Sequence, residues 1–392
     1  MKLFLISVCC FWGTVSTAIA QTWMPSGQTG TWYGLASSAD GSKLVAVGYS
    51  GIFTSTNSGN AWVQSTNAPN LQWVSVASSA DGNTLAAVSR SGPIYASTNG
   101  GAVWVQSDSP STYWAAIASS ADGTRMVAAE GYPAQGYIYT SVDSGMTWSV
   151  NISPYMFWYY VASSADGTKL VAVSHSGEIY TCTDPGGIWY AQQAPSLIWT
   201  SVASSTDGTK LVAAAFGGDG GEIDGGIYTS TNSGANWYAT SAATIYAWTS
   251  VASSADGSKL VAVADGEAGP RCPIYTSTNS GSTWLPNNTP NSVYWSGVAS
   301  SADGNSLAAA FYGNSIYTWQ TTPSPQLSLA SVGNNLEMSW LIPSTNFVVQ
   351  QSSDLISWSE LTNPPTLNLT NLQNQIILSV SASNGFFRLA TP

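Results

Sequence analysis

The sequence predicts an all-β protein: a seven-bladed β-propeller followed by a small C-terminal β-sandwich. The hexapeptide ASSADG occurs six times, and a seventh copy reads ASSTDG. A tryptophan precedes each copy, and these anchor tryptophans recur every 41 to 49 residues. A period of this size is typical of propeller blades, each a four-stranded antiparallel sheet. The anchor tryptophans are Trp32, Trp73, Trp114, Trp158, Trp199, Trp248 and Trp295.

One repeat, from Trp248 to Pro290, shows how four strands fit into the period. Asp256-Gly257 lies between two alternating or apolar runs, and Asp-Gly tolerates the positive φ angles that tight hairpin turns need. We therefore expect the repeated aspartate to hold a turn and not to act as a catalytic carboxylate. The expected strands are a (248–253), b (259–264), c (274–276) and d (282–285).

A second string, S/T-x-N/D-x-G-x-x-W, occurs six times in register with the first, with Cys182 in place of Ser or Thr in one copy. It resembles the Asp-box of the sialidase-type (BNR) repeat families. Its amide or carboxylate can accept backbone N–H groups and hold the c–d turn. Four of the six copies carry Asn, which favours a structural turn over calcium or acid chemistry. The residues concerned are Asn57, Asn99, Asp143, Asp184, Asn232 and Asn279.

The seventh repeat lacks its own strand d, because the chain leaves the pattern after Trp319. Trp23 lies nine residues before Trp32, close to the spacing between each Asp-box tryptophan and the next anchor tryptophan. We therefore expect residues 21–25 to form the missing strand and to close blade 7. Closure of this kind removes an exposed sheet edge.

The two ends of the chain have their own patterns. Residues 1–20 combine Lys2, an apolar run and Ala18-Ile19-Ala20, which predicts a signal peptide cleaved after Ala20 and a secreted or periplasmic protein. The propeller is expected over 21–322. Residues 323–392 alternate apolar and polar side chains between turns and resemble a fibronectin-type module.

The composition excludes several classes of partner. Only 7% of the residues are charged and the formal net charge is −11, which argues against binding to nucleic acid or to anionic membranes. No stretch after the signal peptide is long and apolar enough for membrane insertion, and we expect a monomer. Cys182 and Cys272 are interpreted as unpaired thiols; a disulfide between them is the alternative.

Functional residues are expected on one face of the propeller. The a–b and c–d turns share one face of the propeller, and their sequences are nearly the same in every blade. The b–c and d–a loops share the other face, and their sequences differ between blades, as those of binding loops do. Aromatic side chains there can stack on sugars or hold a peptide. The candidate binding residues are Arg90 and His175 in b–c loops, and Tyr113, Tyr155, Phe157, Tyr246 and Tyr294 in d–a loops.

Acidic residues gather in the b–c loops of blades 5 and 6. Closely spaced oxygen ligands on a glycine-rich loop suit Ca²⁺; a solvated acidic loop without a metal is the alternative. The two loops belong to neighbouring blades and are expected to form one negative patch. The residues are Asp219, Glu222 and Asp224 in blade 5, and Asp265 and Glu267 in blade 6.

Family resemblances bear on the choice between enzyme and binding module. The Asp-boxes imply a sialidase, but that family needs an arginine triad, and only Arg90 and Arg271 are placed to contribute to one. Xyloglucan-type glycosidases also use Asp-box propellers, and they need two carboxylates across a cleft that usually lies between two propellers; this chain has one propeller.

The blade formula W-x-x-V-A…DG…L-V-A-V…G-x-I-Y-x-S-x-x-x-G-x-x-W resembles most closely the repeat of the photosystem II assembly factor family, over residues 21–319. That resemblance implies a seven-bladed, non-enzymatic, partner-binding propeller, although this chain lacks the family's arginine-rich patch. We therefore expect an exported, non-enzymatic propeller without an obligatory cofactor that binds a protein or a glycan. The alternative is a glycan-active hydrolase or lyase that uses His175 with an acid.

Overall fold

The computed structural model describes the chain at residues 23–131, 133–184, 186–217, 225–242, 246–265, 274–287, 294–320, 327–332, 335–341, 348–353, 357–361, 365–368, 373–379 and 386–390. Every regular element in these ranges is a strand. Across the same ranges no helix has the length and apolar character needed to cross a bilayer.

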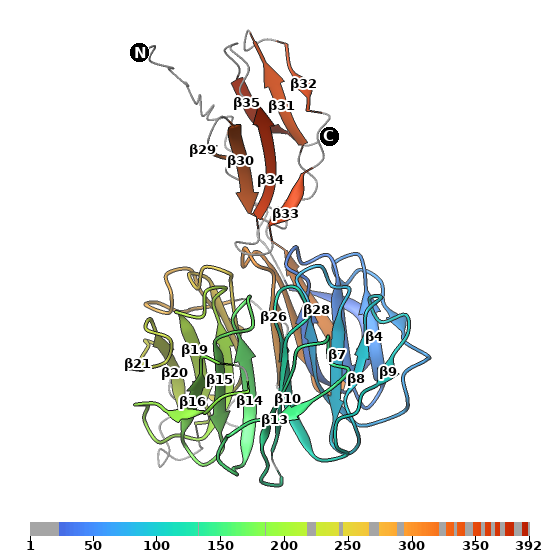
Figure 1. The fold of residues 1–392 in the computed structure, drawn as a ribbon, viewed down its shortest axis with the longest axis vertical. Helices are drawn as coiled ribbons and strands as arrows, with labels where there is room; N and C mark the ends of the chain where they lie inside the picture. Colours follow the sequence, from blue (N-terminus) through green and yellow to red (C-terminus); the bar gives the residue numbers. More distant parts are fainter. Residues whose placement is uncertain are drawn as a thin grey trace.

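The described part of the chain up to Gln320 forms seven four-stranded antiparallel sheets, which we number as blades 1 to 7 (Figure 1). In blades 1 to 6 the four strands follow each other along the chain.

Blade 1 is β2 (Trp32–Ser37), β3 (Leu44–Gly48), β4 (Gly51–Ser55) and β5 (Val63–Gln64). Blade 2 is β6 (Trp73–Ser78), β7 (Leu85–Ser89), β8 (Tyr95–Ser97) and β9 (Val105–Gln106). Blade 3 is β10 (Trp114–Ser119), β11 (Met126–Glu130), β12 (Ile138–Ser141) and β13 (Ser149–Val150). Blade 4 is β14 (Trp158–Ser163), β15 (Leu170–Ser174), β16 (Ile179–Cys182) and β17 (Tyr190–Ala191). Blade 5 is β18 (Trp199–Ser204), β19 (Leu211–Ala215), β20 (Gly226–Ser230) and β21 (Tyr238–Ala239). Blade 6 is β22 (Ala247–Ser253), β23 (Leu260–Asp265), β24 (Tyr275–Ser277) and β25 (Leu285–Pro286).

Blade 7 is built from both ends of the propeller. It contains β26 (Trp295–Ser300), β27 (Ser306–Phe311) and β28 (Asn314–Gln320), and its outer strand is β1 (Met24–Gly30). Met24 pairs with Thr318 and Gly30 with Asn314. The N-terminal strand therefore pairs with blade 7 as expected, but it extends beyond the expected residues 21–25 to Gly30, and its pairing register shifts between Pro25 and Thr29.

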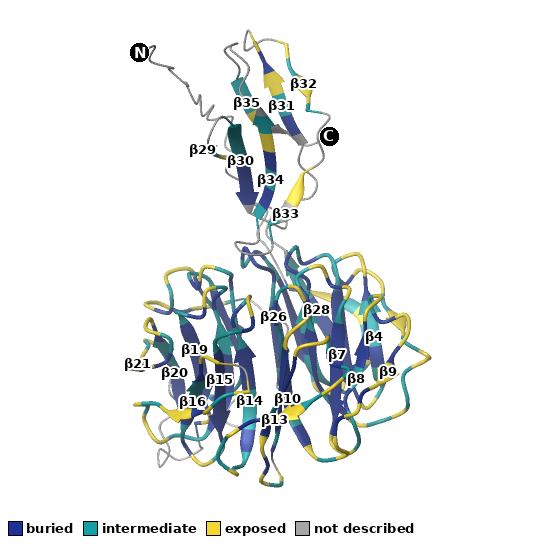
Figure 2. Ribbon diagram, viewed as in Figure 1, coloured by how far each residue is buried: buried dark blue, intermediate teal, exposed yellow. Residues whose placement is uncertain are grey.

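The burial of each strand follows its place in the blade. Strand b is almost continuously apolar, and in β15 all five residues are buried, because this strand lies inside the blade with further sheets on both faces. The two-residue strands d at the outer edge are exposed, as Figure 2 shows. The anchor tryptophans are at most 1% exposed. Trp73 packs against Val45 and Ile52 of the preceding blade, so each anchor tryptophan fills the space between two sheets.

Each ASSADG copy makes a turn and also a contact with the next blade. The glycine of each copy has φ between 68° and 74°, as expected for an Asp-Gly turn. The fourth residue of each copy, Ala or Thr206, donates its backbone N–H to the carbonyl oxygen of its counterpart in the next blade, at 2.7–2.8 Å. Seven such bonds close a ring, which we call the alanine ring. It links Ala39, Ala80, Ala121, Ala165, Thr206, Ala255 and Ala302 in this order and returns to Ala39.

The asparagines of the second string hold the c–d turns as predicted. The Oδ1 atom of Asn57 accepts the N–H of Ala61 at 2.8 Å, and Asn99, Asn232 and Asn279 make the equivalent bond at 2.9–3.0 Å. Blade 4 departs from the pattern because Cys182 replaces the serine, and its Sγ lies 3.0 Å from the carbonyl oxygen of Asp184. Cys182 is a free, buried thiol; Cys272 lies outside the described residues.

The C-terminal strands form two further sheets, drawn as a separate lobe in Figure 1. A single hydrophobic cluster, with Met338, Trp340, Val349 and Ile376 at its centre, draws residues from both sheets. The resemblance to a fibronectin-type module stays a prediction. The first sheet has the order β29 (Ser328–Val332), β30 (Asn335–Leu341), β34 (Gln373–Ser379) and β33 (Thr366–Asn368). The second has the order β32 (Ser359–Glu360), β31 (Val348–Ser352) and β35 (Phe386–Ala390).

Candidate functional site

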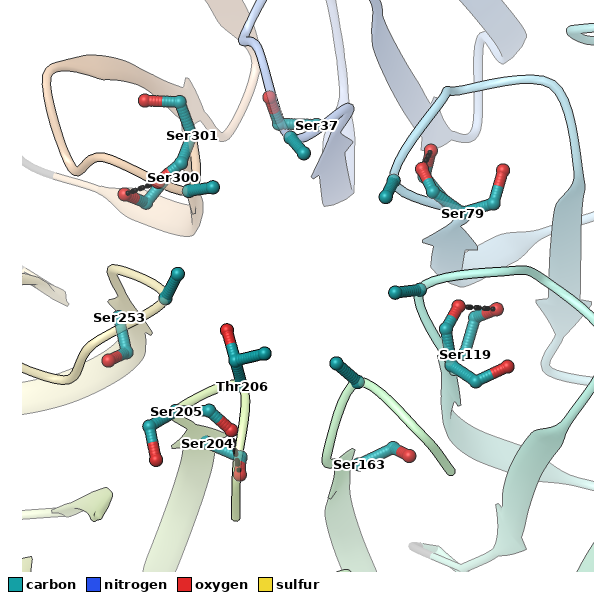
Figure 3. Close-up of a pocket in the computed structure, with 18 of the residues that line it drawn as sticks. Ser37, Ser79, Ser119, Ser163, Ser204, Ser205, Thr206, Ser253, Ser300 and Ser301 are labelled. Atoms are coloured by element: carbon teal, nitrogen blue, oxygen red, sulfur yellow. Dashed lines mark hydrogen bonds between the residues drawn. The ribbon is translucent and has the colours of Figure 1, made fainter. Parts of the chain in front are cut away.

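Two cavities of very different character lie at the two ends of the first strands of the blades. The cavity at the ASSADG end has a volume of about 170 Å³ and is lined by serines together with the residues of the alanine ring. In Figure 3 the labelled serines and Thr206 surround its open centre. Each blade supplies the same small residues to this cavity, apart from Thr206 in place of an alanine.

The cavity at the b–c and d–a loop end has a volume of about 640 Å³, and we call it the aromatic pocket. It lies on the face where the sequence analysis expected functional residues. The lining residues are Tyr33, Val74, Arg90, Trp114, Ala115, Tyr159, Tyr160, Thr200, Phe216, Thr249, Asp265, Tyr294, Trp295, Ser296 and Tyr312.

The residue that follows each anchor tryptophan supplies one part of this lining. In blade 1, Trp32 pairs with Gly48 but Gly34 pairs with Val47, so Tyr33 is an extra residue on the first strand. The same shift occurs at the first strand of all seven blades. A β-bulge re-aims the side chain of the extra residue, and here it places that residue at the pocket. The seven are Tyr33, Val74, Ala115, Tyr159, Thr200, Thr249 and Ser296.

The residue after the strand-b partner of the anchor tryptophan supplies a second part. Trp73 pairs with Ser89, and Arg90 follows; Trp295 pairs with Phe311, and Tyr312 follows. The backbone N–H of Arg90 donates to the carbonyl oxygen of Gln72 at 2.9 Å, which fixes the start of the loop. Phe216 and Asp265 occupy the same position in blades 5 and 6 and also line the pocket.

A cluster of tyrosines joins blades 7 and 1. The Tyr33 ring lies 5.1 Å from the Tyr49 ring and 5.6 Å from the Tyr312 ring, in edge-to-face arrangements. Burial raises the pKa of Tyr33 well above its usual range, and hydrogen bonds with Tyr49 and Tyr312 raise it further. The phenol of Tyr33 is therefore neutral throughout the physiological range. The Cζ atom of Arg90 lies 5.8 Å from the centre of the Tyr33 ring, within the range of a cation–π interaction.

The predicted binding residues separate into two groups. Arg90 and Tyr294 line the aromatic pocket. His175 lies beside it, since its ring stacks at 5.9 Å on Tyr159, which lines the pocket. The others lie elsewhere: Tyr246 packs against Trp248 and Tyr275 in the core, Tyr155 pairs with Tyr137 at 5.0 Å, and Tyr113 and Phe157 are outside the lining.

Of the five residues in the predicted acidic patch, only Asp265 lies within the described part of the chain. Asp265 lines the aromatic pocket, whereas Asp219, Glu222, Asp224 and Glu267 lie outside the described residues. Within the described ranges no group of three or more His, Cys, Asp or Glu side chains is arranged to hold a metal ion. Calcium binding at these loops therefore stays a prediction.

Sequence reasoning missed the pocket residues Tyr33, Tyr159, Phe216 and Tyr312. For Tyr33 and Tyr159 a signal was present, because the position after each anchor tryptophan varies between Tyr, Val, Ala, Thr and Ser while the tryptophan itself repeats. It went unused because strict alternation along a strand does not reveal a bulge.

The repeated aspartates at the ASSADG end have structural partners. Asp207 accepts the Ser205 hydroxyl at 2.6 Å and the Thr209 N–H at 3.0 Å. The bond from Ser205 is the main cause that lowers the pKa of Asp207 to about 2. Asp303 makes the same contacts but is more deeply buried, and this burial raises its pKa. These contacts account for the repeated aspartate as a turn residue.

No protein-family model matches the sequence, and a search of curated proteins finds no match. Solved structures share the fold. YCF48 from Cyanidioschyzon merolae is 14% identical with a TM-score of 0.58, over 77% of this chain and 98% of that one. A YCF48 bound to D1 peptide is 17% identical with a TM-score of 0.55, over 78% and 97%. The GH74 xyloglucanase from Xanthomonas campestris is 15% identical with a TM-score of 0.60, over 82% of this chain and 59% of that one. At this identity the similarity establishes an all-β propeller fold.

Proposed function

We propose that this protein is an exported, non-catalytic binding protein that engages a protein or a carbohydrate through the aromatic pocket. The observation that carries the proposal is the pocket itself: about 640 Å³, lined by tyrosines, tryptophans and Phe216, with a few polar groups among them. Concave, largely apolar sites with a small number of placed polar groups are typical of ligand-binding sites. The central cavity at the ASSADG end of the propeller is smaller, about 170 Å³, and is lined by repeated serines and the residues of the alanine ring.

The chemistry of the lining favours binding over catalysis. Glycoside hydrolysis commonly uses two carboxyl groups that face each other across the scissile bond. Among the described residues that line the pocket, Asp265 is the one carboxylate. The alternative is a hydrolase or lyase that uses His175 with an acid; the one observation in its support is that His175 stacks on Tyr159, a residue of the pocket lining.

The structural neighbours support both ligand classes. One YCF48 structure is bound to a D1 peptide, and another neighbour is a xyloglucanase. Aromatic side chains suit either ligand, because they stack on sugar rings and also pack against peptide side chains. The acidic loops add a separate proposal, Ca²⁺ binding, which calorimetry with Ca²⁺ on the wild-type protein and on an Asp219→Ala/Asp224→Ala variant tests directly.

Arrays of oligosaccharides and of peptides, probed with the mature protein, test the proposal. We expect binding to one class of ligand, with no new product when the bound ligand is recovered and analysed by chromatography. Release of shortened or unsaturated oligosaccharides would favour the enzyme alternative. Absence of binding to both arrays would contradict the proposal.

A further inference from the structure

Three neighbouring blades place a guanidinium and two phenols on one side of the aromatic pocket. Arg90, Tyr49 and Tyr312 follow directly after the strand-b partner of the anchor tryptophan in blades 2, 1 and 7. The bonds of the alanine ring join these three blades in series. The backbone N–H of each residue donates to the carbonyl oxygen of the residue before that tryptophan, at 2.9–3.1 Å. The sheets therefore fix where all three side chains leave the backbone.

Tyr33, the bulge residue of blade 1, brings these side chains together. Its ring lies 5.1 Å from the Tyr49 ring and 5.6 Å from the Tyr312 ring, and the Cζ atom of Arg90 lies 5.8 Å from its centre. Arg90, Tyr33 and Tyr312 line the aromatic pocket, and Tyr49 packs beside them. We call these four residues the arginine–tyrosine group. It combines one cation with three phenol hydroxyls.

The hydroxyls of this group can form hydrogen bonds with a ligand. Burial raises the pKa of Tyr33 above its usual range, and hydrogen bonds with Tyr49 and Tyr312 raise it further, so the Tyr33 phenol keeps its proton. The Tyr49 and Tyr312 side chains are 44% and 46% exposed, so a ligand can reach them from solvent. A protonated phenol both donates and accepts a hydrogen bond, as does each hydroxyl of a sugar.

Arg90 is placed differently from the other described cations of the propeller. Those follow the a–b turns on the opposite face, where lysine ammonium groups bond to the neighbouring turn. They are Lys43, Arg125, Lys169, Lys210 and Lys259. Arg90 is exposed, lines the pocket, and forms no ion pair within the described part of the chain. Its contact with the Tyr33 ring uses no hydrogen-bond acceptor, so its N–H donors remain for a ligand.

We propose that the arginine–tyrosine group binds the carboxylate of an acidic sugar, a uronate residue in an otherwise neutral glycan. This inference rests on the proposed function and names the ligand class of the same pocket. The guanidinium of Arg90 is suited to a carboxylate because its paired N–H donors match the two oxygens. The phenol hydroxyls then meet the sugar hydroxyls next to the carboxylate, and the aromatic lining packs against the C–H faces of the sugar ring.

The charges favour a ligand with a single negative group. A protein with a net charge of −11 repels polyanions at long range. The arginine–tyrosine group offers one positive charge in return. A phosphate monoester carries nearly two negative charges at neutral pH, whereas an isolated uronate carries one. A carboxylate therefore fits this group better than a phosphate does.

The hydroxyls and the size of the pocket favour a sugar over an acidic peptide. A uronate presents its carboxylate and several hydroxyls on one rigid ring, so it can use the cation and the phenols together. A glutamate or aspartate side chain offers a carboxylate without those hydroxyls. The pocket volume of about 640 Å³ lies within the ~300–1,000 Å³ typical of small-molecule sites, which leaves room for a sugar next to the uronate.

Three matched pairs of disaccharides test the inference by calorimetry. Each pair is a neutral hexose that carries glucuronate, galacturonate or mannuronate, and the same disaccharide with the carboxylate reduced to a primary alcohol. We expect at least one acidic disaccharide to bind, and its reduced form to bind at least about tenfold more weakly, because the reduction removes the charge contact with Arg90. Equal binding within every pair, or no binding by any acidic disaccharide, would overturn the inference.

Variants of Arg90 assign the carboxylate to its partner. Arg90→Gln should bind the acidic and the reduced disaccharide about equally. Arg90→Lys keeps the charge but loses the paired donors, and it should keep only part of the preference. Arg125→Gln makes the same charge change on the opposite face and should bind like the wild type. If Arg90→Gln keeps the full preference for the acidic form, the inference is wrong.

Variants of the phenols test the hydroxyl contacts. Tyr49→Phe and Tyr312→Phe each keep the ring and should weaken binding of the acidic disaccharide about two- to tenfold, the usual range for one hydrogen bond. Tyr238→Phe removes a hydroxyl from an outer strand, where the side chain is 65% exposed, and should have no effect. If both pocket variants bind like Tyr238→Phe, the phenols do not contact the sugar and this part of the inference is overturned.

A peptide pair separates this inference from the proposed function. The pair is a tripeptide with blocked ends and a central glutamate, and the same tripeptide with glutamine. If the glutamate peptide binds through Arg90 and no acidic disaccharide binds, the sugar inference fails and the proposed function stands. The same holds if only a neutral ligand binds and is lost in Tyr33→Ala/Tyr312→Ala. If no ligand depends on these residues, both fail.

Discussion

The backbone N–H of Ala302 donates a 2.8 Å hydrogen bond to the carbonyl oxygen of Ala39 and so joins the last blade to the first. This bond completes the alanine ring, in which every blade is tied to its neighbour by the same contact. Because a larger side chain would crowd the small cavity that the ring lines, the repeated alanine has a structural reason. The repetition of ASSADG therefore reflects assembly of the propeller.

Removing one N–H from the alanine ring should lower stability. Ala121→Pro deletes the donor to Ala165, since proline has no backbone N–H, and should lower the free energy of unfolding by about 1–3 kcal/mol or more. Ala121→Gly keeps the N–H and should cost about 0.5–1 kcal/mol. Urea denaturation measures both, and equal losses in the two variants would show that the ring bond contributes nothing.

The N-terminal strand should be needed for a soluble propeller. Deleting residues 21–27 removes the first half of the β1–β28 pairing and leaves part of the β28 edge without a partner. We expect a lower midpoint of thermal unfolding and aggregation detected by light scattering. Met24→Ser, at a side chain that is 60% exposed, keeps the strand and serves as the control. A deletion variant that stays monomeric with an unchanged midpoint would contradict this role.

The c–d turn asparagines should contribute to stability and not to binding. Asn232→Ala removes the acceptor of the Asn236 N–H and should cost about 0.5–2 kcal/mol. Asn232→Asp keeps an acceptor oxygen and should cost less. Unchanged stability together with lost ligand binding would instead give this turn a functional role.

The sequence was sufficient to predict the repeat, the strand order and the closing strand, because each depends on local patterns. Asp-Gly turns and apolar strand runs are read within one repeat, and the tryptophan spacing is read from one repeat to the next. The pocket was only partly predicted, since Arg90 and Tyr294 were named whereas Tyr33 and Tyr312 were not. Tyr33 belongs to the first blade and Tyr312 to the last, so they lie far apart in the sequence. Their rings meet because blade 7 packs against blade 1 in the closed ring. The alanine ring also escaped sequence reasoning, since its bonds join different repeats.

Acid should remove part of the stability supplied by the a–b turns. The pKa of Asp207 is lowered in the folded state to about 2 from 3.8, so its ionised form stabilises the fold at neutral pH, and that contribution is lost as the pH falls from about 4 to 2. Asp207→Asn should therefore flatten the loss of stability in this range, measured by urea midpoints at several pH values. Asp303, whose pKa is raised by burial, should behave in the opposite way: its ionised form costs stability at neutral pH, and protonation relieves the cost. Identical pH profiles for Asp207→Asn and the wild type would contradict the assignment.

The claim that the loop face and not the ASSADG face carries function can be tested by one comparison of affinities. Calorimetry should be run with the best ligand from the arrays on the wild type, on Tyr33→Ala/Tyr312→Ala and on Thr206→Ala. Thr206→Ala gives this position the alanine of the six other copies and changes the lining of the small cavity at the other end. It removes a buried hydroxyl for which the described residues supply no hydrogen-bond partner, so the variant should fold normally. The account predicts that Thr206→Ala binds like the wild type and that the tyrosine variant, with an unchanged unfolding midpoint, binds at least about tenfold more weakly. Full binding by the tyrosine variant, or loss of binding in Thr206→Ala, would contradict it.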